Sequence, residues 1–284
     1  MIRKIALPYL AATALAFFTT PVAIASQAIE LAIVPYLPAR TILERYKPLR
    51  DHLERKLGQP VMLFTAPDYQ TFITRTQKHE YPFVVTVAHA ARLAEREAGY
   101  VPMLRPALDT RALFMVARGS PVNDVADLRT KRVAVPDRMA IVTQLGMQVM
   151  REHGLKPDED VTLMPSATHV TAMHAVLAGE ADAAVVSDRA FIAADSNLKQ
   201  GLRTIATSGS GVPGVVFLAS PMVPPALVAT ITQAIMDFAN ETPEGKQFLQ
   251  ALGYDTLRRV KANELATLDA FVPPLQKLLH QTQP

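Results

Sequence analysis

Ile29-Glu-Leu-Ala-Ile-Val34 is a short apolar run that ends in Pro35-Tyr36-Leu37-Pro38, the pattern of a strand that enters a loop. From Thr41 to Leu57, apolar residues then recur every three or four positions with charges between them, and Gly58 follows as a stop. That spacing predicts an amphipathic helix. A strand followed at once by a helix is the unit from which the rest of the chain is built.

The same alternation continues toward the C-terminus. We predict further strands at 61–65, 82–87, 112–117, 132–135, 161–164, 181–186, 202–206 and 215–219, and helices at 69–78, 88–98, 141–153, 170–178, 225–241, 243–252 and 265–279. Strands that alternate with helices at short spacing form a mostly parallel sheet with helices on both faces. The sequence therefore predicts an α/β fold.

Both halves of the chain are organised alike, as strand, helix, strand, helix, strand. Gly, Ser and Pro lie within or directly after segments 110–118 and 209–216, beside apolar strands. We expect the chain to cross between two lobes at these segments. The length of 284 residues agrees with two lobes, since one domain takes about 150 residues.

Composition excludes several classes of protein. Hydrophobic residues make up 49% of the chain and charged residues 19%, which is too apolar for intrinsic disorder. The absence of Cys excludes disulfide scaffolds, thiolate metal sites and a Cys nucleophile. The net charge is +3, to which Arg3 and Lys4 contribute two charges, and no basic cluster with interleaved aromatic residues occurs. Nucleic-acid binding therefore has little support.

The N-terminus has the pattern of an export signal. A basic start, Met1-Ile-Arg-Lys4, precedes the apolar stretch from Ile5 to Phe18, and Ala23-Ile24-Ala25 fits the rule for a cleavage site. The alternative, a membrane anchor, needs about 20 apolar residues, and this stretch is shorter. We predict a signal peptide over residues 1–25, cleavage near Ala25, and a periplasmic mature protein.

Motifs of common enzymes and metal sites are missing from the sequence. No Gly-x-Ser-x-Gly nucleophile turn and no His-Glu-x-x-His zinc motif occurs. Ser208-Gly-Ser-Gly211 lacks the Lys-Ser/Thr of a phosphate-binding loop. His169 and His174 are five positions apart, which does not place them as a metal pair on one helical face. We therefore expect neither catalysis nor a metal or other cofactor.

Several segments carry a resemblance, in order along the mature chain: Ile33-Val-Pro-Tyr36, Arg45-Tyr-Lys-Pro-Leu-Arg-Asp-His-Leu53, Val61 to Tyr69, Asp127-Leu-Arg-Thr-Lys-Arg-Val133, Ser166-Ala-Thr-His169, Val176-Leu-Ala-Gly-Glu-Ala-Asp-Ala183 and Leu252-Gly-Tyr-Asp255. In this order and at these intervals the chain resembles the phosphate/phosphonate-type substrate-binding proteins of ABC transporters. These proteins have the class II periplasmic binding-protein fold.

The resemblance implies two lobes, each a mostly parallel sheet flanked by helices, joined by two crossover strands. Lobe 1 would comprise 26–113 and 215–284, and lobe 2 would comprise 114–214. It also implies a solute-binding protein that holds a small polar ligand, expected to be phosphate, a phosphonate or a related oxyanion, in the cleft between the lobes. The partner would be an ABC permease. The alternatives are a periplasmic sensor protein that partners a membrane sensor kinase, and an enzyme on the same fold.

The resemblance also points to ligand contacts at the ends of strands, where helix N-termini favour anions. Tyr36 matches a family Tyr that contacts the ligand, although it could instead pack on the lobe surface. Thr86 and His89 flank the next helix start, where His89 is either a donor to the anion or a hydrated residue. His169 matches a ligand-contacting His, and its alternative is a capping or core histidine. Ser166 and Thr168 lie in the same loop.

Loop 136–143 departs most from the family, because it lacks the family's run of hydroxyl residues. Thr143 remains there, and Arg138 is either a bidentate partner for an oxyanion or a solvated side chain. Asp188 follows the strand at 181–186, where it could accept from a ligand amine or hydroxyl, or form a surface pair with Arg189. We expected Tyr36, His89, Arg138 and His169 to converge on one cleft.

Overall fold

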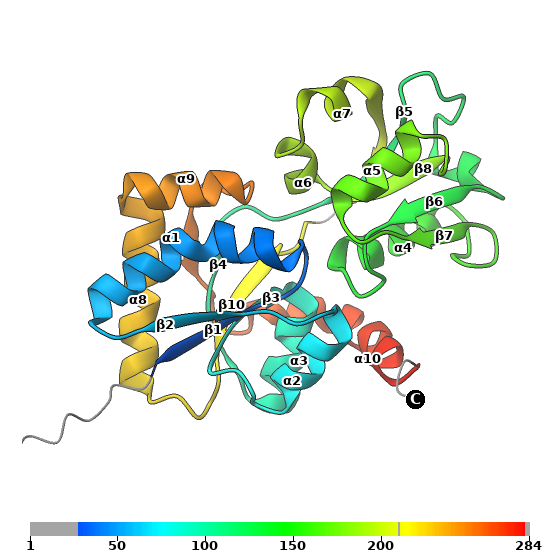
Figure 1. Ribbon diagram of the computed structural model, residues 1–284. Coiled ribbons are helices and arrows are strands. Elements are labelled where there is room, and N and C mark those ends of the chain that lie inside the picture. The colour runs from blue at the N-terminus through cyan, green and yellow to red at the C-terminus, as the bar shows by residue number, and fades with distance from the viewer. Residues whose placement is uncertain (1–27, 210, 282–284) are drawn as a thin grey trace, which may run out of the picture.

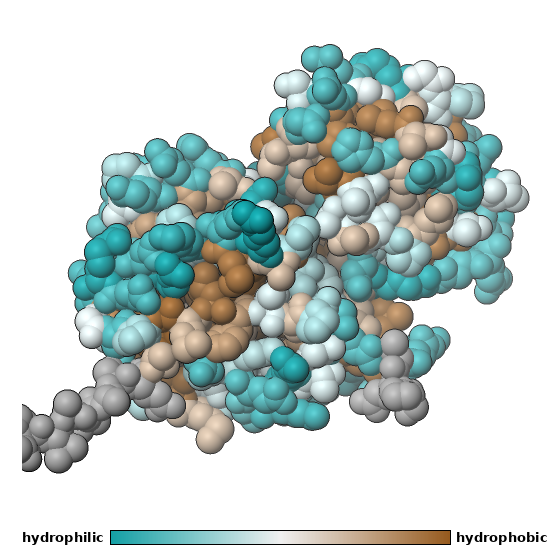
Figure 2. All heavy atoms as spheres, viewed as in Figure 1, coloured by the Kyte–Doolittle hydropathy of each residue, from teal (hydrophilic) through white to brown (hydrophobic). Residues whose placement is uncertain are grey.

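A computed structural model describes residues 28–209 and 211–281 of the chain, and the signal-peptide prediction for 1–25 lies outside them. Two separate β-sheets each carry their own helices (Figure 1). We call the first sheet with its helices the first lobe and the second sheet with its helices the second lobe. Figure 2 shows the lobes as two distinct masses with hydrophilic residues spread over both.

The first lobe contains a six-stranded sheet in the order β11-β4-β10-β3-β1-β2. β1 pairs in parallel with β2 and β3, whereas β10 runs antiparallel to β3 and β4, and β11 antiparallel to β4. Its strands are β1 Ile29–Ile33, β2 Val61–Phe64, β3 Phe83–Val87, β4 Val101–Pro106, β10 Val215–Ala219 and β11 Leu257–Arg259.

Helices cover both faces of this sheet because its strands are apolar on both faces. In β1, Leu31 and Ile33 pack with α1, α8 and α9, whereas Ala32 and the following Val34 pack with α2, α3, η2 and α10. This is the two-residue alternation of a strand buried on both sides. The helices are α1 Ala39–Leu57, α2 Tyr69–Gln77, α3 Ala88–Ala98, α8 Pro225–Glu241, α9 Pro243–Ala251, the 3-10 helix η2 Glu264–Phe271 and α10 Val272–Gln281.

The second lobe contains a five-stranded sheet in the order β7-β6-β8-β5-β9. β6 pairs in parallel with β7 and β8, and β5 runs antiparallel to β8 and β9. The strands are β5 Ala112–Ala117, β6 Arg132–Val135, β7 Thr162–Pro165, β8 Ala183–Ser187 and β9 Leu202–Thr207. The helices are η1 Val125–Leu128, α4 Ile141–Glu152, α5 His169–Leu177, α6 Asp188–Ile192 and α7 Ser196–Gly201.

Two crossovers join the lobes, one between β4 and β5 and the other between β9 and β10. The crossovers pair with each other: the Thr110 N–H donates to the Val212 carbonyl at 2.7 Å, and the Val212 N–H donates to the Thr110 carbonyl at 3.0 Å. The predicted α/β two-lobed fold is confirmed, but both sheets are mixed rather than mostly parallel. The reason is that the strands next to the crossovers, β5, β9, β10 and β4, run antiparallel to their neighbours.

Four elements of the described residues have no clear pattern in the sequence and were not predicted: β4, β11, α6 and α7. β4 contains Pro102 and Pro106, which are unusual inside a sheet because proline has no N–H to donate. β11 has three residues, and α6 and α7 have five and six, which is too short for a periodic pattern to show.

Gly245 lets α8 and α9 pack closely, and its replacement tests this packing. A Cβ on Gly245 would lie 1.7 Å from the carbonyl oxygen of Phe238. We expect Gly245→Ala to lower the free energy of unfolding by about 1–3 kcal/mol, the usual cost of overpacking. Chemical denaturation checks this, with Gly119→Ala as the control because a Cβ there meets nothing within 4 Å. Equal stability of the two variants would contradict the packing argument.

Candidate functional site

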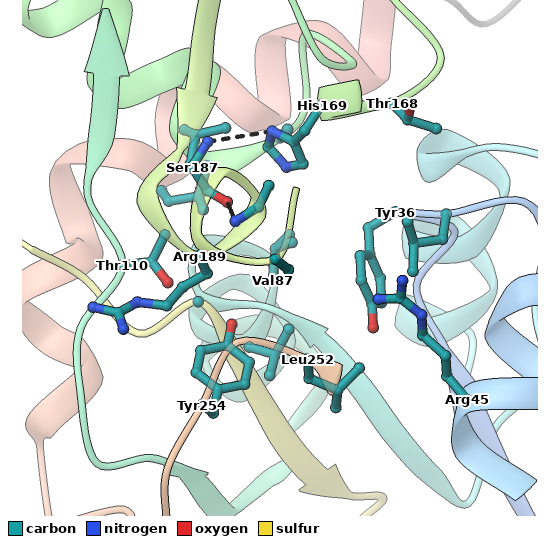
Figure 3. A pocket seen from close by; sticks show the side chains of 18 of the residues that line it. Tyr36, Arg45, Val87, Thr110, Thr168, His169, Ser187, Arg189, Leu252 and Tyr254 are labelled. Atoms are coloured by element: carbon teal, nitrogen blue, oxygen red, sulfur yellow. Dashed lines mark hydrogen bonds between the residues drawn. The ribbon is translucent and has the colours of Figure 1, made fainter. Parts of the chain in front are cut away.

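A cavity of about 130 Å³ lies between the two lobes. The first lobe contributes the loop after β1, the first half of α1, the end of β3 and the segment after α9, and the second lobe contributes the starts of α4, α5 and α6 (Figure 3). The crossovers contribute Thr110 and Gly214. A solute in this cavity would therefore contact both lobes and the crossovers.

Two helices of the second lobe begin at the cavity wall. Ala140, Ile141 and Val142 line it at the start of α4, and Thr168 and His169 line it at the start of α5. The first N–H groups of a helix have no partner within the helix, and the helix dipole places partial positive charge there. These helix starts therefore favour an anion in the cavity.

His169 presents one ring nitrogen to the cavity. Its Nδ1 accepts a hydrogen bond from the Ser187 N–H at 3.3 Å (Figure 3). Because Nδ1 accepts, the proton of the neutral ring resides on Nε2, which can donate to a ligand. Burial lowers the pKa of His169 to about 4. The ring is therefore an uncharged donor near neutral pH.

Arg45 brings a charge to the cavity from α1. Its Nη1 donates to the Ala251 carbonyl at 2.9 Å, and no carboxylate within the described residues forms an ion pair with it. Its positive charge partly offsets the effect of burial, which raises the pKa of Tyr36. Figure 3 shows the guanidinium beside the Tyr36 ring. Most of the five N–H donors of Arg45 are therefore available to a ligand.

Arg189 also lines the cavity, but a carboxylate of the protein offsets its charge. Its Nη2 lies 3.2 Å from Oδ2 of Asp188 and donates to the Asp109 carbonyl at 3.3 Å. The other Asp188 oxygen, Oδ1, accepts from the backbone N–H groups of Arg111 and Arg189. Asp188 itself does not line the cavity, and no Asp or Glu is among the residues that do.

The sequence model for periplasmic substrate-binding proteins of phosphonate ABC transporters matches residues 31–265. The chain belongs to this family. The family consists of transport proteins rather than enzymes, and it implies a small-molecule ligand, a membrane permease as partner and an extracytoplasmic location. Within the described residues, no helix is long and apolar enough to cross a membrane, and no three His, Asp or Glu side chains gather as a metal site.

Solved structures of several binding proteins have the same fold. A binding-protein component of a phosphonate ABC transporter from Pseudomonas aeruginosa has a TM-score of 0.74 and 15% identity, over 90% of each chain. PhnD1 from Prochlorococcus marinus, in complex with methylphosphonate, has a TM-score of 0.77 and 11% identity, over 88% of this chain and 98% of that one. The aliphatic sulphonate-binding protein SsuA from Escherichia coli scores 0.61 at 16% identity, over 90% and 94%.

The binding protein brings three of the predicted site residues together at the cavity: Tyr36, Thr168 and His169. Thr168 also caps α5, since its Oγ1 accepts from the Thr171 N–H at 3.1 Å. Ser166 lies in the same loop but off the cavity lining, and its N–H donates to the Val135 carbonyl at 2.7 Å. Tyr36, Thr168 and His169 are kept in the site proposed below.

Arg138 and Thr143 have protein partners instead. Both outer nitrogens of Arg138 contact the carboxylate of Asp158, one of them at 3.0 Å, and this ion pair lies away from the cavity lining. Thr143 is fully buried, and its hydroxyl donates to the Asp137 carbonyl at 3.0 Å. The expected convergence of Arg138 with His169 on one cleft is therefore wrong.

Thr86 and His89 lie in the interior of the protein. Thr86 is in β3 and 1% exposed, and His89 is in the first turn of α3 and fully buried. The Met139 backbone lies near the His89 ring, but neither ring nitrogen has a partner in hydrogen-bond geometry. Thr86 lies within the predicted strand 82–87 and His89 follows it, but both side chains lie in the interior rather than at the cavity.

Sequence reasoning missed Arg45, Arg189 and Tyr254 as cavity residues. Tyr254 lines the cavity near Thr110, and burial raises its pKa. A signal for it was present in the segment Leu252-Gly-Tyr-Asp255, which resembles the family. Arg45 opens another segment that resembles the family, but it lies inside a helix, where a charged residue usually indicates the solvated face.

The buried ring of His89 should make stability depend on pH. Burial lowers its pKa from 6.5 to about 4, so the unfolded chain binds the proton more readily between these values. The free energy of unfolding should fall as pH drops from 6.5 to 4, by about 3 kcal/mol from this residue alone. Denaturation of the parent and of His89→Gln across this pH range measures it. The variant should lose less stability on acidification, and equal slopes would contradict a neutral, buried His89.

Proposed function

We propose that this binding protein holds a small organic oxyanion in the cleft between its lobes and delivers it to the permease of an ABC transporter. The observation that supports this most is Arg45. Among the residues that the structure describes, its guanidinium has no carboxylate partner, and the cavity that it faces has no Asp or Glu in its lining. An unpaired charge in a half-buried site is costly unless a counter-ion binds. The ligand would be that counter-ion.

Donors around Arg45 would complete the oxyanion site. In this proposal Tyr36 donates its hydroxyl, His169 donates Nε2–H, and the first amides of α4 and α5 point at the anion. Leu37 and Leu252 form part of an apolar wall beside them. An apolar wall next to cationic donors favours an organic anion over inorganic phosphate.

We further propose that the protein is exported with cleavage near Ala25, catalyses no reaction on its ligand, and serves a transporter. The family membership favours the transporter over the sensor-kinase alternative. N-terminal sequencing of protein from its own host would test the cleavage site, and incubation of bound ligand followed by mass analysis would test for turnover.

Arg45 and Arg138 offer a matched pair of substitutions. We expect Arg45→Gln to weaken anion binding about ten- to a hundredfold, since a hydrogen bond to a charged group contributes about 1.5–3 kcal/mol. Arg138→Gln should leave binding unchanged, because its guanidinium pairs with Asp158. Isothermal titration with methylphosphonate, ethanesulfonate and phosphate, with melting temperatures as the folding control, measures both. Loss of binding in Arg138→Gln with none in Arg45→Gln would refute this site.

The paired crossovers suggest that ligand binding closes the lobes by a hinge motion. We infer that the first lobe, up to Pro106 and from Val215 on, moves against the second lobe, Ala112–Thr207. The expected boundary at residue 113 moves to the crossover before β5, because Ala112 and Leu113 already pair with β8. A saturating anion should then reduce the radius of gyration in small-angle scattering while the circular dichroism spectrum stays the same. An unchanged radius at saturation would argue against closure.

A further inference from the structure

We propose that the cleft selects a singly charged organic anion with an aliphatic tail, such as a sulfonate or a carboxylate, over a doubly charged phosphonate or phosphate and over tails that carry an ammonium group. This inference rests on the proposed function, because it specifies the ligand of the same cleft. The grounds are the charge of the cavity, the donors at the start of α4, and the wall that the tail would contact.

The cavity offers one uncompensated positive charge. In the part of the chain that the structure describes, Arg45 has no carboxylate partner, whereas Arg189 lies 3.2 Å from Asp188, and both members of that pair are largely buried. His169 is neutral near pH 7, as argued above. A monoanion therefore leaves no charge unpaired, while a dianion would bring a second negative charge out of water without a partner, which is unfavourable.

The start of α4 supplies backbone donors but no hydroxyl. The three residues that line the cavity there are Ala140, Ile141 and Val142. The next residue, Thr143, is fully buried and donates its hydroxyl to the Asp137 carbonyl. A doubly charged head needs more donors than a singly charged one, and the start of α4 adds only its backbone N–H groups.

The tail would contact an apolar wall. Leu37, Val87, Val170 and Leu252 line the cavity, and no acidic side chain does. Asp188, which at this position could accept from a ligand amine, instead accepts from backbone N–H groups and pairs with Arg189. An ammonium group in the cleft would have no anionic partner among the described lining residues, which together with the apolar wall favours an aliphatic tail.

Ligands with the same propyl-sized skeleton test the head and the tail separately. We expect this from isothermal titration at a pH above the second ionisation of propylphosphonate, where that ligand is a dianion. There 1-propanesulfonate and butyrate should bind about tenfold or more tightly than propylphosphonate. Propylphosphonate should gain affinity below its second ionisation, where it is a monoanion, while propanesulfonate should not change. Taurine replaces the terminal methyl of propanesulfonate by an ammonium group and should bind at least about tenfold more weakly.

The Asp188–Arg189 pair gives a second, structural test. Asp188→Asn frees the charge of Arg189 and should shift the ratio of propylphosphonate to propanesulfonate affinity toward the phosphonate by about threefold or more. Asp158→Asn is the control, since it removes the same charge beside Arg138, off the cavity lining. If the ratio of propylphosphonate to propanesulfonate affinity is the same in Asp188→Asn and Asp158→Asn, the charge argument is overturned.

The outcomes separate this inference from the function on which it rests. Tighter binding of dianionic propylphosphonate than of propanesulfonate would overturn the preference for a monoanion, with oxyanion binding intact. Tighter binding of taurine than of propanesulfonate would overturn the aliphatic tail. Failure of every sulfonate, carboxylate, phosphonate and phosphate to bind the folded protein would instead refute the proposed function itself.

Discussion

Two backbone hydrogen bonds between the crossovers connect the lobes and set the geometry of the cleft. Thr110 and Val212 each donate to the other's carbonyl, so the two crossovers run as one paired ribbon. Gly214 continues that ribbon directly against Tyr254, since a Cβ on Gly214 would lie 2.1 Å from the Tyr254 hydroxyl oxygen. Because Thr110, Gly214 and Tyr254 all line the cavity, a displacement of the ribbon changes the cavity wall. The paired crossovers and the cavity wall are therefore mechanically coupled.

Much of the fold could be predicted because it depends on local pattern. The apolar run at Ile29–Ile33 and the period of α1 are visible in the sequence, and the structure has both. The direction of the strands next to the crossovers could not be predicted, because it depends on where the chain changes lobes. β4 was missed because its two prolines indicate a loop locally, whereas β10 and β11 pair with it on either side in the sheet.

The sequence predicted only those residues of the candidate site that come directly after a strand. Tyr36 follows β1 of the first lobe, and Thr168 and His169 follow β7 of the second lobe. A parallel strand presents such residues at the carboxyl edge of its own sheet. Arg45 reaches the cavity from within α1, which depends on how that helix lies across the first lobe. Arg138 occupies a loop of the expected kind, yet Asp158 pairs with it. A carboxylate twenty positions away in sequence is a tertiary contact that no local pattern contains.

The lobes also share buried apolar side chains away from the hinge, in a cluster that joins α3 and η2 with α4 and the loop before it. His89 lies at this contact beside Met139, with both ring nitrogens unpaired. A buried polar group without a hydrogen bond costs about 1–3 kcal/mol, and separation of the lobes would let water satisfy it. The unpaired ring thus offsets part of the apolar attraction between the lobes. Opening of the lobes would therefore relieve a cost at His89, a residue that lies at the contact between the lobes and not in the cavity lining.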